Sequence, residues 1–294
     1  MSLKEKFSGS FVALITPMSE QGEIDFDALS KLIEWHIENG TNGLVILGTT
    51  AETVTLTEQE KWAVLTHAIK INDGRLPIIV GNGSNCTATT IATTKKYNEL
   101  AIDGYLTVTP YYNKPNQRGT VAHFKAVAEA TDKPIILYNV PGRTNLDLSN
   151  DSVITLMAIK NIVGIKDATG DLDRVGVFKQ ASDEFVLLSG DDATSREFVR
   201  LGGHGTISVT ANVAPHFVAE MITAARKGDS TLASSVDSKI EALHKDLFIE
   251  PNPVPAKFAL KELGLISSDF VRLPLVELEP NSKNVIKQAL QPIK

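Results

Sequence analysis

The sequence predicts an α/β fold, a (β/α)8 TIM barrel followed by a C-terminal helical domain. Eight short apolar runs recur along the chain, and most neighbouring runs are separated by one amphipathic helical pattern. Near-continuous apolar runs are typical of parallel strands buried on both faces, and eight strand–helix units close a barrel. The chain has 294 residues, and a single barrel of this kind fills about 250 residues.

The eight predicted strands are, in chain order, Phe11–Thr16, Gly43–Leu47, Pro77–Val80, Tyr105–Val108, Pro134–Tyr138, Ile162–Ile165, Phe185–Leu188 and Thr206–Val209. Between the first two, residues Asp27–Asn39 carry their apolar side chains on one helical face. An open, doubly wound sheet is the alternative. It is disfavoured because no Gly-x-Gly-x-x-Gly motif follows the first strand, where a dinucleotide-binding fold needs it.

From about Asn212 onward the chain shows helical patterns and no further strand signal. Amphipathic helices are predicted at Ala214–Lys227, Ser230–Leu247 and Val254–Leu263. The cluster Pro251–Pro255 separates the last two, because proline cannot continue a helix. We therefore predict a barrel domain over residues 1–228 and a helical domain over residues 229–294.

Composition excludes several classes of partner. Hydrophobic residues make up 43% of the chain and charged residues 22%, as in an ordinary globular protein. The net charge of −6, without blocks of like charge, argues against nucleic acid or an anionic membrane surface as partner. No apolar run is long enough to span a bilayer, and the first residues do not resemble a signal peptide. A cytoplasmic location is predicted.

Cysteine and histidine usage indicates neither disulfides nor metal. The single cysteine, Cys86, excludes an internal disulfide and fits a reducing compartment. We expect it to be a small packed residue rather than a reactive thiol. The six histidines lack metal-ligand spacing, so no metal or other cofactor is predicted.

One lysine stands where a surface lysine is not expected. Lys166 follows the apolar run Ile162–Ile165, and lysine is rarely buried without a reason. Burial disfavours the charged ammonium and so lowers its pKa, which leaves an amine able to form a Schiff base with a ketone. The alternative is a strand end at the surface, with the Lys166 side chain extending into solvent.

Polar side chains collect at the carboxyl ends of the predicted strands. They lie in Thr16-Pro17, Gly48-Thr-Thr-Ala-Glu52, Thr109-Pro-Tyr-Tyr112, Tyr138-Asn-Val-Pro-Gly-Arg143 and at Lys166. In a barrel these ends form one rim, which is the catalytic face of this fold. A single threonine or asparagine there is ordinary strand-to-loop sequence. Two tyrosines, an arginine and a lysine on one rim favour an active site.

These segments closely resemble the dihydrodipicolinate synthase family of pyruvate-dependent class I aldolases. The resemblance runs over essentially the whole chain and rests on Gly48-Thr-Thr-Ala-Glu52, Thr107-Val-Thr-Pro-Tyr-Tyr-Asn113, Leu137-Tyr-Asn-Val-Pro-Gly-Arg-Thr144, Gly164-Ile-Lys-Asp-Ala-Thr-Gly170, Leu188-Ser-Gly-Asp-Asp192, Gly202-Gly-His-Gly-Thr-Ile-Ser-Val209 and Glu250-Pro-Asn-Pro-Val-Pro255. It implies a (β/α)8 barrel with a C-terminal helical domain, in a homotetramer of two tight dimers. It also implies condensation of pyruvate with L-aspartate-4-semialdehyde, on the route to diaminopimelate and lysine.

The resemblance also implies roles for individual residues. Lys166 matches the Schiff-base lysine, and Tyr138 matches a proton carrier that works in a relay with Thr49 and Tyr112. The tyrosine matching Tyr112 reaches across the tight dimer into the neighbouring site. A phenol has an ordinary pKa near about 10, so the relay is needed for Tyr138 to act as a base.

Further matches concern substrate binding. Arg143 matches the arginine that receives the semialdehyde carboxylate, which a planar guanidinium can bind through two hydrogen bonds. A salt bridge on the rim is the alternative for Arg143. Thr50 and the backbones of Gly190 and Ile207 match groups that line the pyruvate site.

A regulatory site is expected to be degenerate. In strongly lysine-inhibited members, the effector binds at the dimer interface near the loop after Gly-Thr-Thr. This chain keeps Asn85 and Tyr111, and Thr53 is similar to the serine found there. The inhibited members carry histidines where this chain has Glu58 and Lys61, and a glutamate where it has Thr89. Weak or absent inhibition by lysine is therefore expected.

Two rival functions remain open on the sequence. Another pyruvate-lysine aldolase, of the N-acetylneuraminate lyase or keto-deoxy-sugar aldolase type, shares the lysine and tyrosine. The second threonine of Gly48-Thr-Thr50 and the Arg143 motif favour the synthase. A non-catalytic barrel that binds a keto acid would need no proton relay. The intact set of Lys166, Tyr138, Thr49 and Tyr112 therefore argues against it.

Overall fold

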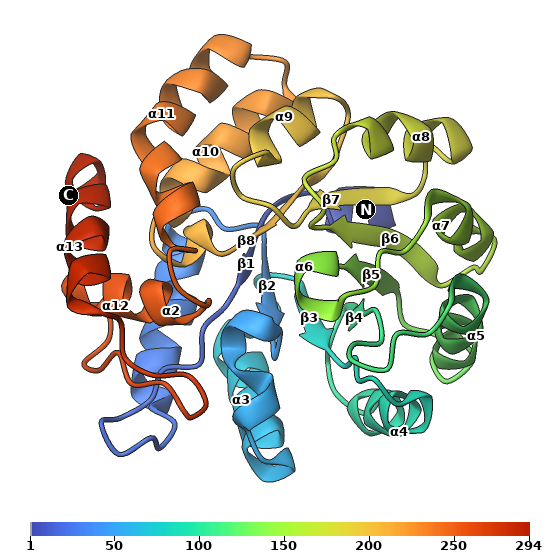
Figure 1. Cartoon of the computed structure of the whole chain (residues 1–294), viewed down its shortest axis with the longest axis horizontal. Helices are drawn as coiled ribbons and strands as arrows, with labels where there is room; N and C mark the ends of the chain where they lie inside the picture. The colour runs from blue at the N-terminus through green and yellow to red at the C-terminus, as the bar shows by residue number, and fades with distance from the viewer. Residues whose placement is uncertain (1) are drawn as a thin grey trace.

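The computed structural model describes residues 2–294 and shows a closed barrel of eight parallel strands. The strands follow one another around the barrel in chain order, and β8 pairs with β1 (Figure 1). Their bounds are β1 Gly9–Ala13, β2 Gly43–Ile46, β3 Ile78–Gly81, β4 Gly104–Val108, β5 Ile135–Asn139, β6 Ile162–Asp167, β7 Val186–Ser189 and β8 Gly205–Ser208. The predicted fold class is confirmed.

Every second side chain along each strand points into the barrel, and these side chains fill its interior. Phe7, Phe11, Val45, Ile79 and Ile136 belong to this inner cluster. A Cβ at Gly43 would lie 2.0 Å from the Phe11 ring, so glycine is required opposite this phenylalanine. The cluster extends to Tyr138 and Val140 at the carboxyl end of β5.

Most of the helices surround the barrel and shield the outer face of its strands (Figure 1). In chain order they are α2 Phe26–Glu38, α3 Glu58–Asn72, α4 Thr87–Tyr97, α5 Gln117–Ala128, α7 Asn150–Met157, α8 Asp173–Ala181, α9 Ser195–Arg200 and α10 Pro215–Arg226. Two single-turn helices do not belong to this layer: α1 Leu3–Lys6 precedes β1, and α6 Pro141–Thr144 lies over the barrel mouth (Figure 1). Several begin at a side-chain cap. In α3, Thr57 and Glu60 satisfy each other's backbone N–H groups in a capping box.

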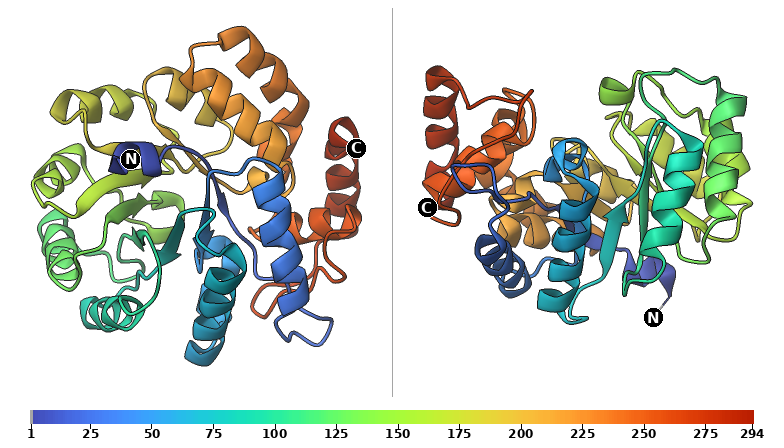
Figure 2. Two further views of the ribbon diagram at one scale, coloured as in Figure 1. Left: turned by 180° about the vertical axis from the view of Figure 1, so that it is seen from behind. Right: turned by 90° about the horizontal axis from the view of Figure 1, so that it is seen from below.

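Three further helices complete the chain, α11 Ser230–Asp246, α12 Val254–Glu262 and α13 Pro280–Ala289. Two views show α12 and α13 to one side of the barrel, with the C-terminus away from the N-terminus (Figure 2). The helical patterns of the sequence do not predict α13. Its buried side chains are few, Ser282, Ile286 and Ala289, so its apolar stripe is short. Across residues 2–294, no helix has the length and apolarity needed to cross a membrane.

Two local predictions are wrong. The first strand is Gly9–Ala13 rather than Phe11–Thr16. Residues 14–16 are buried, but the Ile15 N–H donates to the side chain of Asn212 rather than to a neighbouring strand. Cys86 is exposed rather than packed, because it precedes α4 at the surface. Met1, with which the predicted barrel domain begins, lies outside the described residues.

Candidate active site

A cavity of about 170 Å³ opens at the carboxyl ends of the strands. Six of the predicted site residues line it: Thr49, Thr50, Tyr138, Arg143, Lys166 and Gly190. They come from four strands or the segments that directly follow them, β2, β5, β6 and β7. The barrel therefore brings together groups that lie far apart in the sequence, at the face where this fold performs its chemistry.

Lys166 lies inside β6 and points into the barrel, so the alternative of a surface strand end is excluded. Its side chain is 5% exposed. It pairs in register with Tyr138 on β5, and its Nζ lies 4.4 Å from the centre of the Tyr138 ring. Among residues 2–294, no carboxylate lies within ion-pair distance of Lys166. The amine is thus held in the cavity without an acidic partner.

Two contacts fix the threonine loop that follows β2. Thr49 and Thr50 lie in the short 3-10 helix Thr49–Ala51. The Thr16 hydroxyl donates to the Ala51 carbonyl at 2.9 Å, which ties the loop to the end of β1. The Asn252 side-chain amide donates to the Thr50 hydroxyl oxygen at 2.9 Å. Because that oxygen already accepts a hydrogen bond, the Thr50 hydroxyl proton is free to be donated into the cavity.

Asn252 is the lining residue that sequence reasoning missed. It is buried and lies in the proline cluster between α11 and α12. The proline cluster predicts a helix break and forms part of the family resemblance. The only other signal is that an asparagine stands between two prolines, although the helix break does not require one.

A buried ion pair anchors the same loop from behind. Glu52 follows the 3-10 helix in the left-handed backbone region, with φ of 55°. Its carboxylate pairs with Lys257 of α12, and its second oxygen accepts from the Arg272 N–H at 3.0 Å. The Lys257 Nζ also donates to the Phe270 carbonyl at 2.9 Å. Burial lowers the pKa of Lys257 from its ordinary value, while the Glu52 carboxylate opposes that shift.

Arg143 is available for a ligand. It lies on the short helix α6, which begins with Pro141 directly after β5, and its side chain is exposed at the rim of the cavity. Among residues 2–294, Arg143 belongs to no ion pair, so the alternative of a rim salt bridge is not supported. An unpaired guanidinium beside the cavity can accept a carboxylate.

Two predicted site residues lie outside the cavity lining. Ile207 is buried inside the barrel on β8. Tyr112 is 87% exposed and has φ of 74°. This left-handed backbone conformation is uncommon for a bulky side chain and marks the position as special. Within one chain, Tyr112 is not part of the site.

Gly190 leaves the space that Lys166 occupies. A Cβ at Gly190 would lie 2.9 Å from Lys166 Cε and 2.8 Å from the Ala168 Cβ. Gly190→Ala is expected to displace the lysine and slow its reaction with a keto acid by tenfold or more, on the order of what a 1 Å misplacement costs. Stopped-flow or quenched trapping of the adduct measures this rate. Gly176→Ala in α8 is the matched control, because its added methyl group meets no atom within 4 Å.

A second cavity of about 260 Å³ adjoins the first. It shares Thr49, Tyr138 and Arg143 with the first, and Thr53 and Tyr111 line it as well. The other positions of the predicted regulatory site do not line it. Glu58 forms ion pairs with Lys61 at 2.8 Å and Lys96 at 3.6 Å, and the Asn85 carbonyl accepts from the Asn113 side chain. Thr89 is exposed on α4.

Comparison with known proteins agrees with this geometry. The model of the dihydrodipicolinate synthetase family matches residues 6–293. The 4-hydroxy-tetrahydrodipicolinate synthase of Pseudoalteromonas atlantica is 51% identical over 97% of this chain and 98% of the relative.

Solved structures agree as well. That of the chloride-inhibited dihydrodipicolinate synthase from Acinetobacter baumannii, complexed with pyruvate, is 47% identical, with a TM-score of 0.95 over 97% of this chain and 98% of that one. A monomeric dihydrodipicolinate synthase variant is 37% identical, with a TM-score of 0.95 over 98% and 97%. The chain belongs to the dihydrodipicolinate synthetase family, as the motifs at its barrel rim predicted.

Proposed function

We propose that this chain is a 4-hydroxy-tetrahydrodipicolinate synthase, a lyase-type aldolase that condenses pyruvate with L-aspartate-4-semialdehyde in the cytoplasm. The observation that carries the proposal is Lys166, buried in the cavity, without an acidic partner, and beside the Tyr138 ring. The relatives named above support the same reaction.

The chemistry begins at the Nζ atom of Lys166. Its nitrogen attacks C2 of pyruvate, and loss of water gives an iminium. The iminium acidifies the methyl group, which loses a proton to give an enamine. The enamine carbon then attacks the aldehyde carbon, and the aldehyde oxygen takes up a proton. Tyr138, over whose ring the lysine nitrogen lies, is the group placed to carry these protons.

Substrate carboxylates are held by two kinds of group. The Thr50 hydroxyl, whose oxygen accepts from Asn252, donates to the pyruvate carboxylate. Arg143 at the rim binds the carboxylate of the semialdehyde, because its guanidinium has no competing partner among the described residues. The two ends of the cavity thus receive different substrates.

Trapping tests the proposal directly. After incubation with pyruvate and borohydride, peptide mass spectrometry is expected to place the reduced adduct on Lys166. Absence of any adduct indicates a keto-acid binder, and an adduct on another lysine rejects the assignment. Comparing aspartate semialdehyde with sugar aldehydes as acceptors then separates the synthase from N-acetylneuraminate lyase or keto-deoxy-sugar aldolase activity.

We further propose that the active site is shared between two chains of a homotetramer built from tight dimers. Tyr112 supports this, because it is exposed, has a left-handed backbone and lies outside its own chain's cavity lining. In this arrangement Tyr112 of one chain completes the proton relay of Thr49 and Tyr138 in its neighbour.

Complementation between two inactive variants is expected from this arrangement. Mixing Tyr112→Phe with Lys166→Ala protomers should build dimers in which one site holds both intact residues. Activity after subunit exchange should exceed that of either parent. If mixed dimers form, shown by mass spectrometry, and stay as inactive as the parents, Tyr112 does not act across the interface.

Weak inhibition by lysine is expected. An effector ammonium needs an anionic partner, and the carboxylate of Glu58 is already paired with Lys61 and Lys96. Thr89 supplies no charge. Together these features are expected to weaken lysine binding by about tenfold or more relative to strongly inhibited members. A lysine titration at subsaturating pyruvate measures the effect. Half-inhibition below about 1 mM, corresponding to roughly 4 kcal/mol of binding or more, would contradict it.

A further inference from the structure

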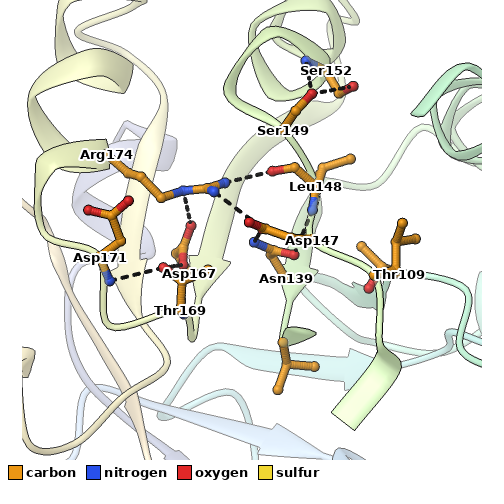
Figure 3. Close-up of polar contacts among 12 residues, drawn as sticks. Thr109, Asn139, Asp147, Leu148, Ser149, Ser152, Asp167, Thr169, Asp171 and Arg174 are labelled. Carbon is orange, nitrogen blue, oxygen red and sulfur yellow. Dashed lines mark hydrogen bonds and ion pairs between the residues drawn. The ribbon is translucent and has the colours of Figure 1, made fainter. Parts of the chain in front are cut away.

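A polar cluster around Arg174 lies at the ends of β5 and β6 (Figure 3). Tyr138 pairs with Lys166 across β5 and β6, and the next residues, Asn139 and Asp167, pair in the same way. Because side chains alternate along a strand, Asn139 and Asp167 point out of the barrel toward the helices. Both are buried. Each reactive residue is therefore followed by a polar residue on the opposite face of the sheet.

Arg174 of α8 connects these two residues to one loop. Its Nε forms an ion pair with Asp167 at 2.8 Å. One terminal nitrogen donates to the Asp147 carboxylate at 3.2 Å, and the other donates to the Leu148 carbonyl at 2.7 Å. Asn139 completes the circuit, donating to Asp147 at 2.8 Å and accepting from the Leu148 N–H at 3.0 Å.

The cluster is held firmly because two of its charges, those of Arg174 and Asp167, are paired away from solvent. Arg174 is 5% exposed and Asp167 is 4% exposed. Burial raises the pKa of the Asp167 carboxyl, and the Arg174 charge opposes that shift. Asp167 also accepts from the Thr169 N–H at 2.9 Å and hydroxyl at 2.6 Å. Two directed hydrogen bonds, to Asp147 and Leu148, fix the orientation of the Arg174 guanidinium, and the ion pair with Asp167 balances its charge.

The position of the cluster matters because both strands end there. β5 ends at Asn139 and β6 at Asp167, so the cluster lies at the last residue pair of the ladder that holds Tyr138 and Lys166 in register. The Asp167 carbonyl also accepts from the Gly190 N–H at 2.7 Å. The backbone of Asp167 thus sets the spacing between Lys166 and the glycine that lies against its side chain.

We infer that Arg174 is a positioning residue, which holds Lys166 and Tyr138 in the mutual geometry required for attack on the keto acid. It acts through Asp167 and Asn139 and touches neither substrate. The inference rests on the proposed Schiff-base reaction. It predicts a defect in formation of the pyruvate adduct and none in binding of the aldehyde carboxylate, since Arg143 lies on a different helix.

The test is Arg174→Lys, which keeps a positive charge but loses the planar fork. The rate of borohydride-trappable adduct formation with pyruvate is expected to fall at least tenfold, on the order of the cost of a small misplacement of a reacting group. KM for aspartate semialdehyde should stay within about twofold of wild type, because the Arg143 subsite is unchanged. Rates are compared well below the melting temperature of each variant.

Arg196→Lys is the matched control. The Arg196 Nε forms an ion pair with Asp237 at the same 2.8 Å distance, but Asp237 lies on α11 and neither residue follows a reactive strand end. This control tests whether replacing an ion-paired guanidinium outside the barrel slows the reaction by itself. It should lower the melting temperature without slowing adduct formation.

Asp147→Ala is the second variant. Asp147 is half-exposed, and without it Arg174 still has its ion pair with Asp167. It removes one contact from Arg174 and one from Asn139 and should slow adduct formation several-fold. Wild-type adduct rates in Arg174→Lys, or in Asp147→Ala if the first variant does not fold, overturn the inference. Equal slowing in Arg196→Lys also overturns it. Absence of a Lys166 adduct in the wild-type protein instead rejects the proposed function.

Discussion

Replacing Lys166 by alanine is expected to abolish the pyruvate adduct and to lower kcat by about a thousandfold or more, because removing a covalent nucleophile leaves only binding and electrostatic effects. No other lysine lines the cavity at the barrel rim. Borohydride trapping followed by mass spectrometry measures the adduct, and a coupled assay with both substrates measures kcat. Borohydride together with pyruvate should inactivate the wild-type protein by reducing the iminium on Lys166, whereas borohydride alone should leave it active.

The fold should survive this substitution, because Lys166 is in no ion pair among residues 2–294 and its removal leaves no buried carboxylate unpaired. Thermal unfolding checks this. Lys160→Ala, at an exposed position before β6, controls for the loss of one lysine charge. A Lys166→Ala protein that still traps pyruvate at the wild-type rate would show that the nucleophile lies elsewhere.

The second large effect is expected for Arg143→Ala. Adduct formation with pyruvate should be unchanged, while kcat/KM for aspartate semialdehyde should fall by about a hundredfold, the cost of losing a charge-assisted pair. The side chain is exposed, so a change in stability is not expected. Steady-state kinetics with the semialdehyde as the varied substrate give the result.

Arg226→Ala is the control for this variant. Arg226 lies in the last turn of α10 and is also exposed, and it does not line the cavity. Its loss changes the net charge equally. If Arg143→Ala kept the wild-type kcat/KM for the semialdehyde, or if Arg226→Ala reduced it to the same extent, Arg143 would not be the carboxylate receptor.

The residues that the sequence could place are those at strand ends. Lys166 and Tyr138 each follow an apolar run, and parallel strands of a barrel present their carboxyl ends at one rim, so their convergence follows from local pattern alone. Asn252 could not be placed in the same way. It meets Thr50 from about two hundred residues away, and nothing local indicates that the proline cluster reaches the barrel mouth.

The role of Arg174 could not be predicted from local sequence either. On α8 it is one charged residue among several, and its burial depends on how the loop around Leu148 returns to the end of β5. Asn139, taken singly, was indistinguishable from ordinary strand-to-loop sequence. Exposure of Cys86 depends in turn on where α4 begins. Such features are set by contacts between elements, which hydrophobic periodicity does not encode.

The pairing of Glu52 with Lys257 has a consequence for biosynthesis on the ribosome. Glu52 is translated about two hundred residues before Lys257 and Arg272. A buried carboxylate without its cation costs several kcal/mol. The Thr49–Glu52 loop therefore cannot take its final place in a nascent chain that contains all eight strands but not yet Lys257. The ability to bind a keto acid should appear only once α12 has been made and has packed, and not when the eighth strand closes the barrel.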